Sequence, residues 1–287
     1  MNEYLQKEGD CICMIELVEA KILSDQMNAS IRGKRIIKVT TLYSPHKFAF
    51  FYGDPQAYGE LLKGRRIGEA APNGGQIRME IENLIFVIGD GVVLRYYEKD
   101  VKRPVKHQLL IEFEDGSTMS GSVQMYGFLW CVDEKEFDNP YYIVAKEKPS
   151  LLSEQFDKEY FMRILTAQDA QKLSAKAILA TEQRIPGLGN GILQDILYYA
   201  GLHPKRKVGT FHQDDIDRLY HSVKNTPAQM IAQGGRNTEK DFYGNPGGYV
   251  TRLSKNTVGK PCLSCGHIIQ KEAYLGGSIY YCDVCQK

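Results

Sequence analysis

Long apolar runs are absent from this 287-residue chain, and so is a strong excess of charge of either sign. No stretch approaches the ~20 apolar residues of a membrane-spanning helix, and the opening segment "MNEYLQKEGDCIC" is acidic and polar, unlike a secretory signal peptide. A net charge of +1 indicates no particular partner. These absences favour a globular protein of the cytoplasm with no membrane association.

Cysteine is scarce until the C-terminal end of the chain, where four of the seven cysteines gather. An odd number argues against a disulfide framework. The segment "CLSCGHIIQKEAYLGGSIYYCDVC" holds two Cys-x-x-Cys pairs, Cys262/Cys265 and Cys282/Cys285, separated by sixteen residues. This spacing is typical of a tetrahedral four-thiolate zinc site, closed and therefore structural. We expect a hairpin between the pairs, with Gly276 and Gly277 at its tip and one Zn²⁺ supplying its folding energy.

The rest of the chain divides by periodicity. After a helix expected over residues 16–29, segments such as "QIRMEIENLIFVIGDGVVLRYYE" are rich in β-branched and aromatic residues and carry turn signals, which favours a sandwich or barrel. From residue 151 the period is helical, with Ser153 as a candidate N-cap and Gly201 as a helix stop. Residues 139–150 have a proline near each end and indicate a linker.

A glycine-rich turn, "RIPGLGNGILQDILYYAG", precedes one of these helices. Backbone amides at a helix N-terminus suit an anion, and Asn190 would present a polar side chain to a phosphate. A tight connection between two helices explains the glycines equally well, and the Rossmann and P-loop patterns are excluded by the lack of a βαβ unit.

Two carboxylates begin the first helix, Glu16 and Glu19, which lie on one face because they are three residues apart. From residue types alone, favourable interaction with the helix dipole is the simpler explanation.

Taken in order, these segments resemble the formamidopyrimidine-DNA glycosylase / endonuclease VIII family over residues 14–287. "MIELVEAKILSDQMNASIRGKRI" is similar to its opening helix and strand entry, "AKAILATEQRIPGLGNGILQDILYYAGLHPKRK" to its helix–two-turn–helix motif, and the final cysteine segment to its zinc finger. The resemblance implies an α+β chain of two domains. We expect a leader or extension at 1–13, a β-sandwich with flanking helices at 14–138, the linker at 139–150, a helix–two-turn–helix domain at 151–258 and the zinc finger at 259–287.

The resemblance also implies a monomer that binds double-stranded DNA, damaged or abasic, and flips a nucleotide out of the stack; such a protein would associate with the nucleoid in a prokaryote. Lys176 and Asn190 match positions that hold DNA phosphates. Gln124 and Tyr126, in "QMYG", match positions that fill the void left by the flipped base. Glu16 matches a catalytic glutamate.

Three departures concern the chemistry. The family's mature chain begins with a proline whose amine attacks the sugar, and here Ile15 holds that place, preceded by Met14. An amide nitrogen is not a nucleophile, so imine chemistry would need a free amine at Met14. Gly75 and Gly277 stand where the family has a lysine and an arginine on the phosphates, which should weaken DNA binding.

Three hypotheses follow. The first is a DNA glycosylase with an altered catalytic set, with or without AP-lyase activity, in which Glu16 is the acid/base and Lys176 a less favoured substitute amine. The second is an inactive reader of damaged or distorted DNA. The third is a zinc-finger protein that binds RNA or protein. We favour the first slightly over the second, and DNA over other ligands.

Overall fold

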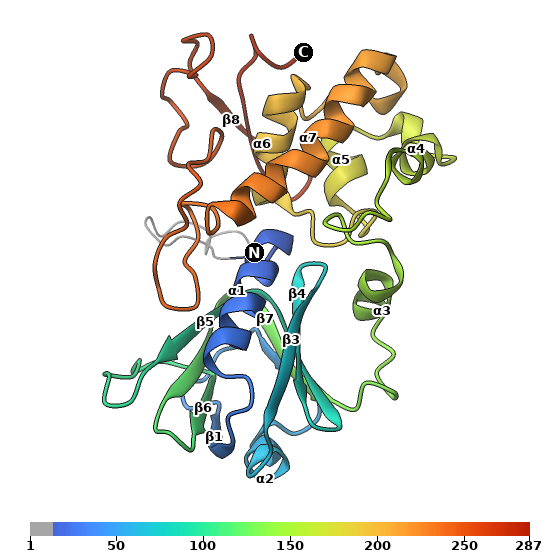
Figure 1. The fold of residues 1–287 in the computed structure, drawn as a ribbon. Helices are drawn as coiled ribbons and strands as arrows, with labels where there is room; N and C mark the ends of the chain where they lie inside the picture. The colour runs from blue at the N-terminus through green and yellow to red at the C-terminus, as the bar shows by residue number, and fades with distance from the viewer. Residues whose placement is uncertain (1–13) are drawn as a thin grey trace.

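The computed structural model describes residues 14–287, so the expected leader at 1–13, with Cys11 and Cys13, lies outside the described residues. A strand-rich half and a helix-rich half stack along the long axis of the molecule, with α1 between them (Figure 1). The prediction of an α+β fold with two domains is thus confirmed. The boundaries assigned from the sequence remain a prediction.

One seven-stranded sheet forms the N-terminal domain, in the order β1-β6-β7-β5-β4-β3, with β2 paired in parallel to β7. The strands are β1 Ile36–Thr41, β2 Ala49–Phe51, β3 Ile67–Asn73, β4 Gln76–Ile81, β5 Leu84–Tyr97, β6 Leu109–Phe113 and β7 Thr118–Val132. A short helix, α2 Tyr58–Leu62, lies at the far end from the helical domain (Figure 1). The long strands β5 and β7 extend to the end of the domain that faces the C-terminal helices.

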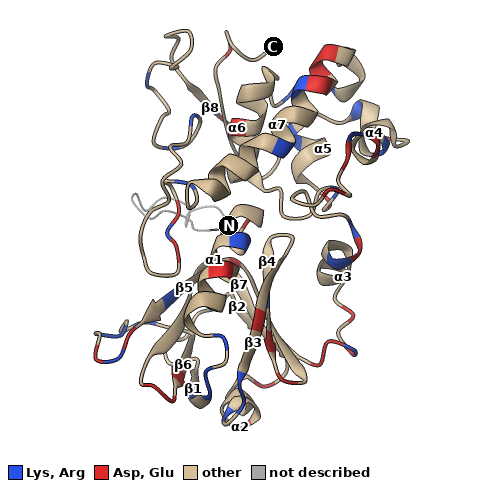
Figure 2. Cartoon of the chain, viewed as in Figure 1, with Lys and Arg blue, Asp and Glu red and all other residues tan. Residues whose placement is uncertain are grey.

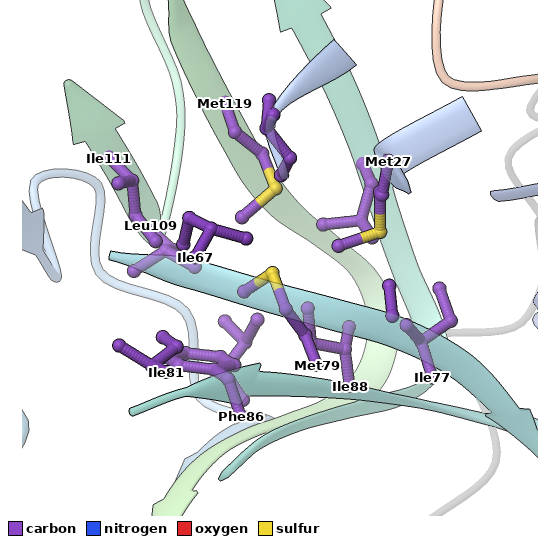
Figure 3. Close-up of a cluster of buried hydrophobic side chains, with 14 of the residues drawn as sticks. Met27, Ile67, Ile77, Met79, Ile81, Phe86, Ile88, Leu109, Ile111 and Met119 are labelled. Atoms are coloured by element: carbon purple, nitrogen blue, oxygen red, sulfur yellow. The ribbon is translucent and has the colours of Figure 1, made fainter. Parts of the chain in front are cut away.

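The core of this domain is apolar and comes from nearly every strand. Figure 3 shows Met79, Ile88 and Phe86 facing Leu109 and Met119 across the interior, and all of them are buried in one cluster. Alternating apolar residues place one face of each strand inward, as the period-two pattern predicted. Burial of each large aliphatic side chain stabilises the fold by about 1.5–3 kcal/mol.

Helix α1, Leu17–Ser30, belongs to both domains. Leu23 and Met27 are buried in the sheet core, whereas Leu17 and Val18 are buried in the core of the C-terminal helices. Because opposite ends of one helix enter different cores, the residues just before it are fixed at the junction of the domains. The expected helix at 16–29 is confirmed.

The segment expected as a linker, 139–150, contains a helix, α3 Pro140–Glu147. Asn139 caps it by accepting the N–H groups of Tyr141 and Tyr142, and Pro140 at the first helical position has no N–H to satisfy. The prolines that indicated a linker therefore bracket a helix, because proline is favoured at a first turn.

The C-terminal domain contains α4 Lys158–Thr166, α5 Ala175–Ala180, α6 Asn190–Ala200 and α7 Gln213–Ala232. The assignment of Ser153 as an N-cap is wrong: α4 begins four residues later than expected from that cap, and the Asp157 side chain accepts the N–H of Tyr160. The helix stop at Gly201 is confirmed, since this residue ends α6 in the left-handed conformation with φ 67°.

The chain ends in a two-stranded hairpin, β8 Gln270–Tyr274 and β9 Gly277–Tyr281, as expected from its glycines. No helix within residues 14–287 has the length and apolar character to cross a bilayer. Lysine and arginine are interspersed with aspartate and glutamate in both domains (Figure 2), so net charge does not single out a binding face in this view.

Candidate functional site

The carboxylate of Glu16 joins the two domains. Its Oε1 accepts the N–H of Gly191 at 2.7 Å and its Oε2 accepts the N–H of Ile192 at 2.8 Å. These amides lie in the first turn of α6, where unpaired N–H groups and the helix dipole favour an anion. These two amides of the glycine-rich turn therefore bind the Glu16 carboxylate, and the phosphate contact suggested by the sequence for Asn190 stays a prediction.

A buried arginine completes this contact. The Arg236 guanidinium donates through Nε to Glu19 Oε1 at 2.9 Å, its Nη2 lies 2.8 Å from Glu19 Oε2, and the same Nη2 lies 3.8 Å from Glu16 Oε2. All three side chains are buried. We call Glu16, Glu19 and Arg236 the junction cluster. The sequence did not identify Arg236, because nothing in its loop marks which of the charged residues turns inward.

The glycines of the turn are explained by how closely the junction cluster approaches them. A Cβ at Gly189 would lie 2.4 Å from Glu16 Cδ, and a Cβ at Gly191 would lie 1.7 Å from Arg236 Nη1. A side chain at either position would displace Glu16 or Arg236, so the junction cluster in this arrangement requires glycine at both.

Burial raises the pKa of Glu16, an effect that Arg236 and the two amide hydrogen bonds oppose and that the neighbouring Glu19 reinforces. Burial alone would lower the pKa of Arg236, but Glu19 and Glu16 outweigh it and raise the pKa instead. Arg236 therefore stays charged, while Glu16 holds a proton more readily than an exposed glutamate does. A raised pKa is a property that a general acid requires.

Ile15, at the nucleophile position implied by the resemblance, carries an ordinary peptide nitrogen. Its N–H donates to the carbonyl oxygen of Asp90 at 2.9 Å, and its side chain is buried in the sheet core. Gly75 lies against it, since a Cβ there would be 3.0 Å from the Ile15 carbonyl oxygen. The position expected to carry a lysine therefore adjoins the start of α1, but offers no charge.

A cavity of about 330 Å³ opens beside these residues, between the two domains. Its walls come from the start of the described chain, the strands and the α6 turn. They include Met14, Ile15, Glu16, Gly75, Asp90, Tyr126, Tyr141, Glu182 and Asn190. Most residues that the sequence analysis singled out in the N-terminal domain thus surround one space, together with Asp90, which it did not single out.

Strand β7 bulges at the edge of this cavity. The pairing of β5 with β7 shifts register between Asp90 and Val92, so residues 124–126 project from the ladder. Tyr126 is 41% exposed. A bulge that turns side chains out of the sheet is common beside active sites. Gln124 and Tyr126 are therefore presented at the surface, as their predicted contact with DNA requires, although that role stays a prediction.

Lys176 and Asn190 meet at the C-terminal hairpin. Lys176 Nζ donates to the Tyr274 carbonyl at 2.6 Å, and Asn190 Nδ2 donates to the Ser278 carbonyl at 2.9 Å. Gly277 lies between them, because its Cβ would be 3.5 Å from Lys176 Nζ. These two side chains hold the hairpin tip against α5 and α6, and their predicted phosphate contacts stay a prediction.

The four C-terminal cysteines form one cluster. The Sγ atoms of Cys262, Cys265, Cys282 and Cys285 all lie within 4.8 Å of one another. Individual separations are 3.8 Å for Cys262–Cys285 and 3.4 Å for Cys265–Cys282. Zn–S bonds of about 2.3 Å in a tetrahedron place sulfur atoms about 3.8 Å apart. The predicted pairing of the two Cys-x-x-Cys knuckles is confirmed as a cluster with the donors and spacing for one metal ion.

Proteins of known identity resemble this chain along most of its length. The formamidopyrimidine-DNA glycosylase of Bacillus cereus is 25% identical over 282 residues, which cover 95% of this chain and 99% of that protein. The enzyme of the same name from Prochlorococcus marinus is 29% identical over 194 residues, 64% of each chain. No protein-family model matches the chain.

Solved structures share the arrangement of both domains. The MutM (Fpg) protein of Thermus thermophilus superimposes with a TM-score of 0.77 at 21% identity, over 94% of this chain and 98% of that one. Lactococcus lactis Fpg, solved in complex with DNA that contains an abasic site, gives a TM-score of 0.79 at 21% identity, over 95% and 99%.

The chain is similar in sequence and in fold to the formamidopyrimidine-DNA glycosylase / endonuclease VIII family. The resemblance stated from the motifs is thereby confirmed. Within this family scaffold, the junction cluster and the cavity beside Asp90 are the features that the motifs did not predict.

Proposed function

We propose that this protein binds damaged double-stranded DNA in the cleft between its domains and removes a damaged base by breaking the N-glycosidic bond. The observation that carries this proposal is the cavity beside Glu16, because residues of both domains line it and it adjoins the projecting residues of β7. Relatives that match up to about 95% of the chain are named as DNA glycosylases, and structural neighbours hold abasic or lesion-containing DNA.

Each part of the cleft has a distinct task in this proposal. Tyr126 enters the duplex and stacks where the flipped nucleotide was. Asn190 contacts a phosphate next to the lesion, at the N-terminus of α6. Glu16, whose pKa burial raises, supplies a proton during base release.

We also propose that the four cysteines hold one structural Zn²⁺, which would fix the hairpin that packs against Lys176 and Asn190. A closed four-thiolate shell leaves no position for a substrate, so the metal would take no part in the chemistry. We place the protein in the cytoplasm, at the nucleoid of a prokaryotic cell.

Binding and chemistry are tested separately. The intact protein is titrated with a duplex that carries a tetrahydrofuran abasic analogue and with the undamaged duplex. We expect at least tenfold tighter binding to the former, about 1.4 kcal/mol. Duplexes with oxidised bases are then assayed for base release. Tight binding with no release from any lesion would support the inactive reader instead.

Glu16→Gln is the variant that tests the acid. We expect base release to fall about a hundredfold or more, and binding of the abasic analogue to change little. Glu69→Gln, an exposed carboxylate on β3, is the matched control. Because Glu16 also joins the domains, thermal unfolding of each variant is measured first, and base release is assayed well below the transition.

Cys262→Ser tests the metal. We expect bound zinc, measured by atomic absorption, to fall from about one per chain to none, and DNA binding to weaken at least tenfold as the hairpin loses its fold. Cys131→Ser, at a buried cysteine of the sheet, should leave the zinc content unchanged. Zinc retained by the Cys262 variant would refute the assignment of this ligand.

A further inference from the structure

Asp90 lies on the strand side of the cavity, directly beside the start of α1. Its carbonyl oxygen accepts the N–H of Ile15, and Asp90 lines the same cavity as Glu16. It therefore stands next to the position from which the reacting sugar would be approached if the cavity takes a flipped nucleotide.

The backbone of Asp90 is strained. Its φ of 55° lies in the left-handed region, at the point where β5 and β7 shift register. A non-glycine residue in this conformation is uncommon and costs about 1 kcal/mol, although aspartate and asparagine tolerate it better than most. Strain of this kind is found where a side chain must be held in a particular place.

The Asp90 side chain has no hydrogen-bonding or ionic partner among the described residues. The titratable groups that share its cavity are Glu16, Tyr126 from β7, Tyr141 from α3 and Glu182 from the loop after α5; no lysine, arginine or histidine is among the lining residues that the structure describes. Burial raises the pKa of Asp90 to about 6. This carboxylate is thus ionised at neutral pH and retains its full capacity to accept a proton.

Glu16 is differently placed, because both of its oxygens accept amide hydrogens and Arg236 lies beside it. The nitrogen of Ile15 is an amide and cannot form an imine. The cavity therefore holds one carboxylate free to accept a proton and one that is restrained, but no amine from Ile15.

We propose that Asp90 is the general base of this site: it activates a water molecule, so that the base removal proposed above is a hydrolysis rather than an imine-forming reaction. This inference rests on the proposed function. The water oxygen bonds to the sugar C1′ as the C1′–N bond breaks. One water proton passes to Asp90, the departing base takes the electron pair of the broken bond and a proton from Glu16, and Glu16 recovers a proton from Asp90 through solvent. Water and the nucleotide become an abasic sugar and a free base.

The first test needs no turnover. A carboxylate beside C1′ attracts the positive charge that develops on the sugar, so a duplex with a cationic pyrrolidine abasic analogue should bind more tightly than one with neutral tetrahydrofuran. For the unmodified protein we expect about a tenfold preference at pH 7.5 that declines as the pH falls through about 6. Asp90→Asn should abolish the preference, and asparagine can keep the left-handed backbone.

Asp100→Asn is the matched control, because Asp100 is also an aspartate of positive φ, 66°, but is exposed beyond the end of β5. It should keep the full preference. No preference in the unmodified protein, or a preference that survives Asp90→Asn, overturns the assignment of Asp90. In either case specific binding of the tetrahydrofuran duplex would leave the proposed DNA binding intact, whereas loss of all lesion binding overturns both proposals.

The second test uses base release. Asp90→Asn should lower the rate about a hundredfold or more while binding of the tetrahydrofuran duplex changes less than threefold. In water enriched in ¹⁸O, the label should enter the C1′ hydroxyl of the product during the release step, as followed in single-turnover samples quenched before the sugar exchanges. A covalent adduct trapped by borohydride on the pathway of base release would overturn the hydrolytic mechanism.

Discussion

Two carboxylates that line one cavity, Glu16 and Asp90, have contrasting surroundings. Glu16 accepts two hydrogen bonds from α6 and adjoins Arg236, whereas Asp90 has no such partner among the described residues. Burial raises the pKa of both. The two carboxylates therefore differ in their contacts: Glu16 joins the domains, in addition to its proposed role as the acid, whereas Asp90 makes no contact of that kind with the described residues.

The contacts of Glu16 also supply a structural reason for a glutamate at this position, independent of catalysis. A carboxylate bound by the first turn of α6 stabilises the domain junction whether or not DNA is cleaved. A glutamate at residue 16 is therefore compatible both with an enzyme and with an inactive reader of damaged DNA. Asp90 is the better criterion, because a carboxylate with a strained backbone and no partner among the described residues does not stabilise the fold.

The largest expected effect on stability comes from removing Arg236, the cation beside Glu16 and Glu19. Arg236→Leu leaves Glu16 and Glu19 buried without a cation, and we expect the free energy of unfolding to fall by about 3–5 kcal/mol at pH 7.5. Urea unfolding followed by circular dichroism measures it. The deficit should shrink at acidic pH, as protonation of Glu16 removes one of the unpaired charges.

Arg218→Leu provides the comparison for that experiment. Its guanidinium pairs with the buried Asp215 at 2.5 Å, but the Arg218 side chain is 52% exposed and Arg206 remains paired with Asp215 when Arg218 is replaced, so we expect a loss of about 0–1 kcal/mol. Equal losses for the two arginine variants would show that the junction cluster does not depend on its buried charge.

Replacing Asp90 should have a smaller effect on stability, and of the opposite sign. Asp90→Asn should raise the free energy of unfolding at pH 7.5 by about 1–2 kcal/mol, because it removes a partly buried charge that no described residue compensates. A pKa raised in the folded state means that the native protein binds the proton more tightly, so the penalty grows as the pH rises from about 4 to about 6. Below that window the gain should vanish.

Urea unfolding of Asp90→Asn and of the unmodified protein at several pH values measures this gain. A variant that is less stable than the unmodified protein at pH 7.5 would indicate that Asp90 has a stabilising partner, and the contrast with Glu16 would fail. Together with the loss of base release, a gain in stability would make Asp90 a site where function is kept at the expense of stability.

The smallest effect comes from giving Asp90 a partner. Gly75 lines the same cavity, and its Cβ would be 3.0 Å from the Ile15 carbonyl oxygen, a contact that a shift of a few tenths of an ångström relieves. Gly75→Lys should strengthen binding of the abasic duplex a few-fold at low salt and steepen the salt dependence by about one phosphate contact. The new ammonium should also lower the pH at which base release rises, to below about 6.

Gel-shift titrations over a range of salt concentrations and a pH–rate profile measure these changes. Gly75→Gln is the matched control, since it adds a side chain of similar length without charge. If glutamine and lysine have the same effect, electrostatics near Asp90 does not govern binding or rate.

Much of the secondary structure could be predicted from sequence patterns that involve residues close together in the chain. The helix at α1, the stop at Gly201 and the hairpin between the cysteine pairs each depend on residues a few positions apart. The N-cap of α4 was misplaced because serine and aspartate are both good caps, and only the local backbone decided for Asp157. The helix within 139–150 was missed because proline indicates both a loop and the first turn of a helix.

The site was only partly predictable from the sequence. Family motifs identified Glu16, Asn190 and Lys176, but not their hydrogen-bond partners: the Lys176 ammonium donates to the Tyr274 carbonyl of the hairpin, 98 residues further along the chain. Arg236 carries no motif, and it meets Glu19 across 217 residues of chain. Asp90 stands in "GDG", which indicates a turn by itself, yet the residue lies in the long strand β5 at a change of register.

By itself, then, the sequence determined the secondary structure of most segments, the four metal-ligand candidates and the family, because these rest on local spacing and on ordered motifs. The tertiary structure alone decided which carboxylate is bound and which is free. Glu16 meets the α6 amides 175 residues further along the chain, whereas no lysine, arginine or histidine is among the described residues that line the cavity with Asp90. The electrostatic state of a buried acid depends on what folding brings within a few ångströms of it, and no local pattern encodes that distance.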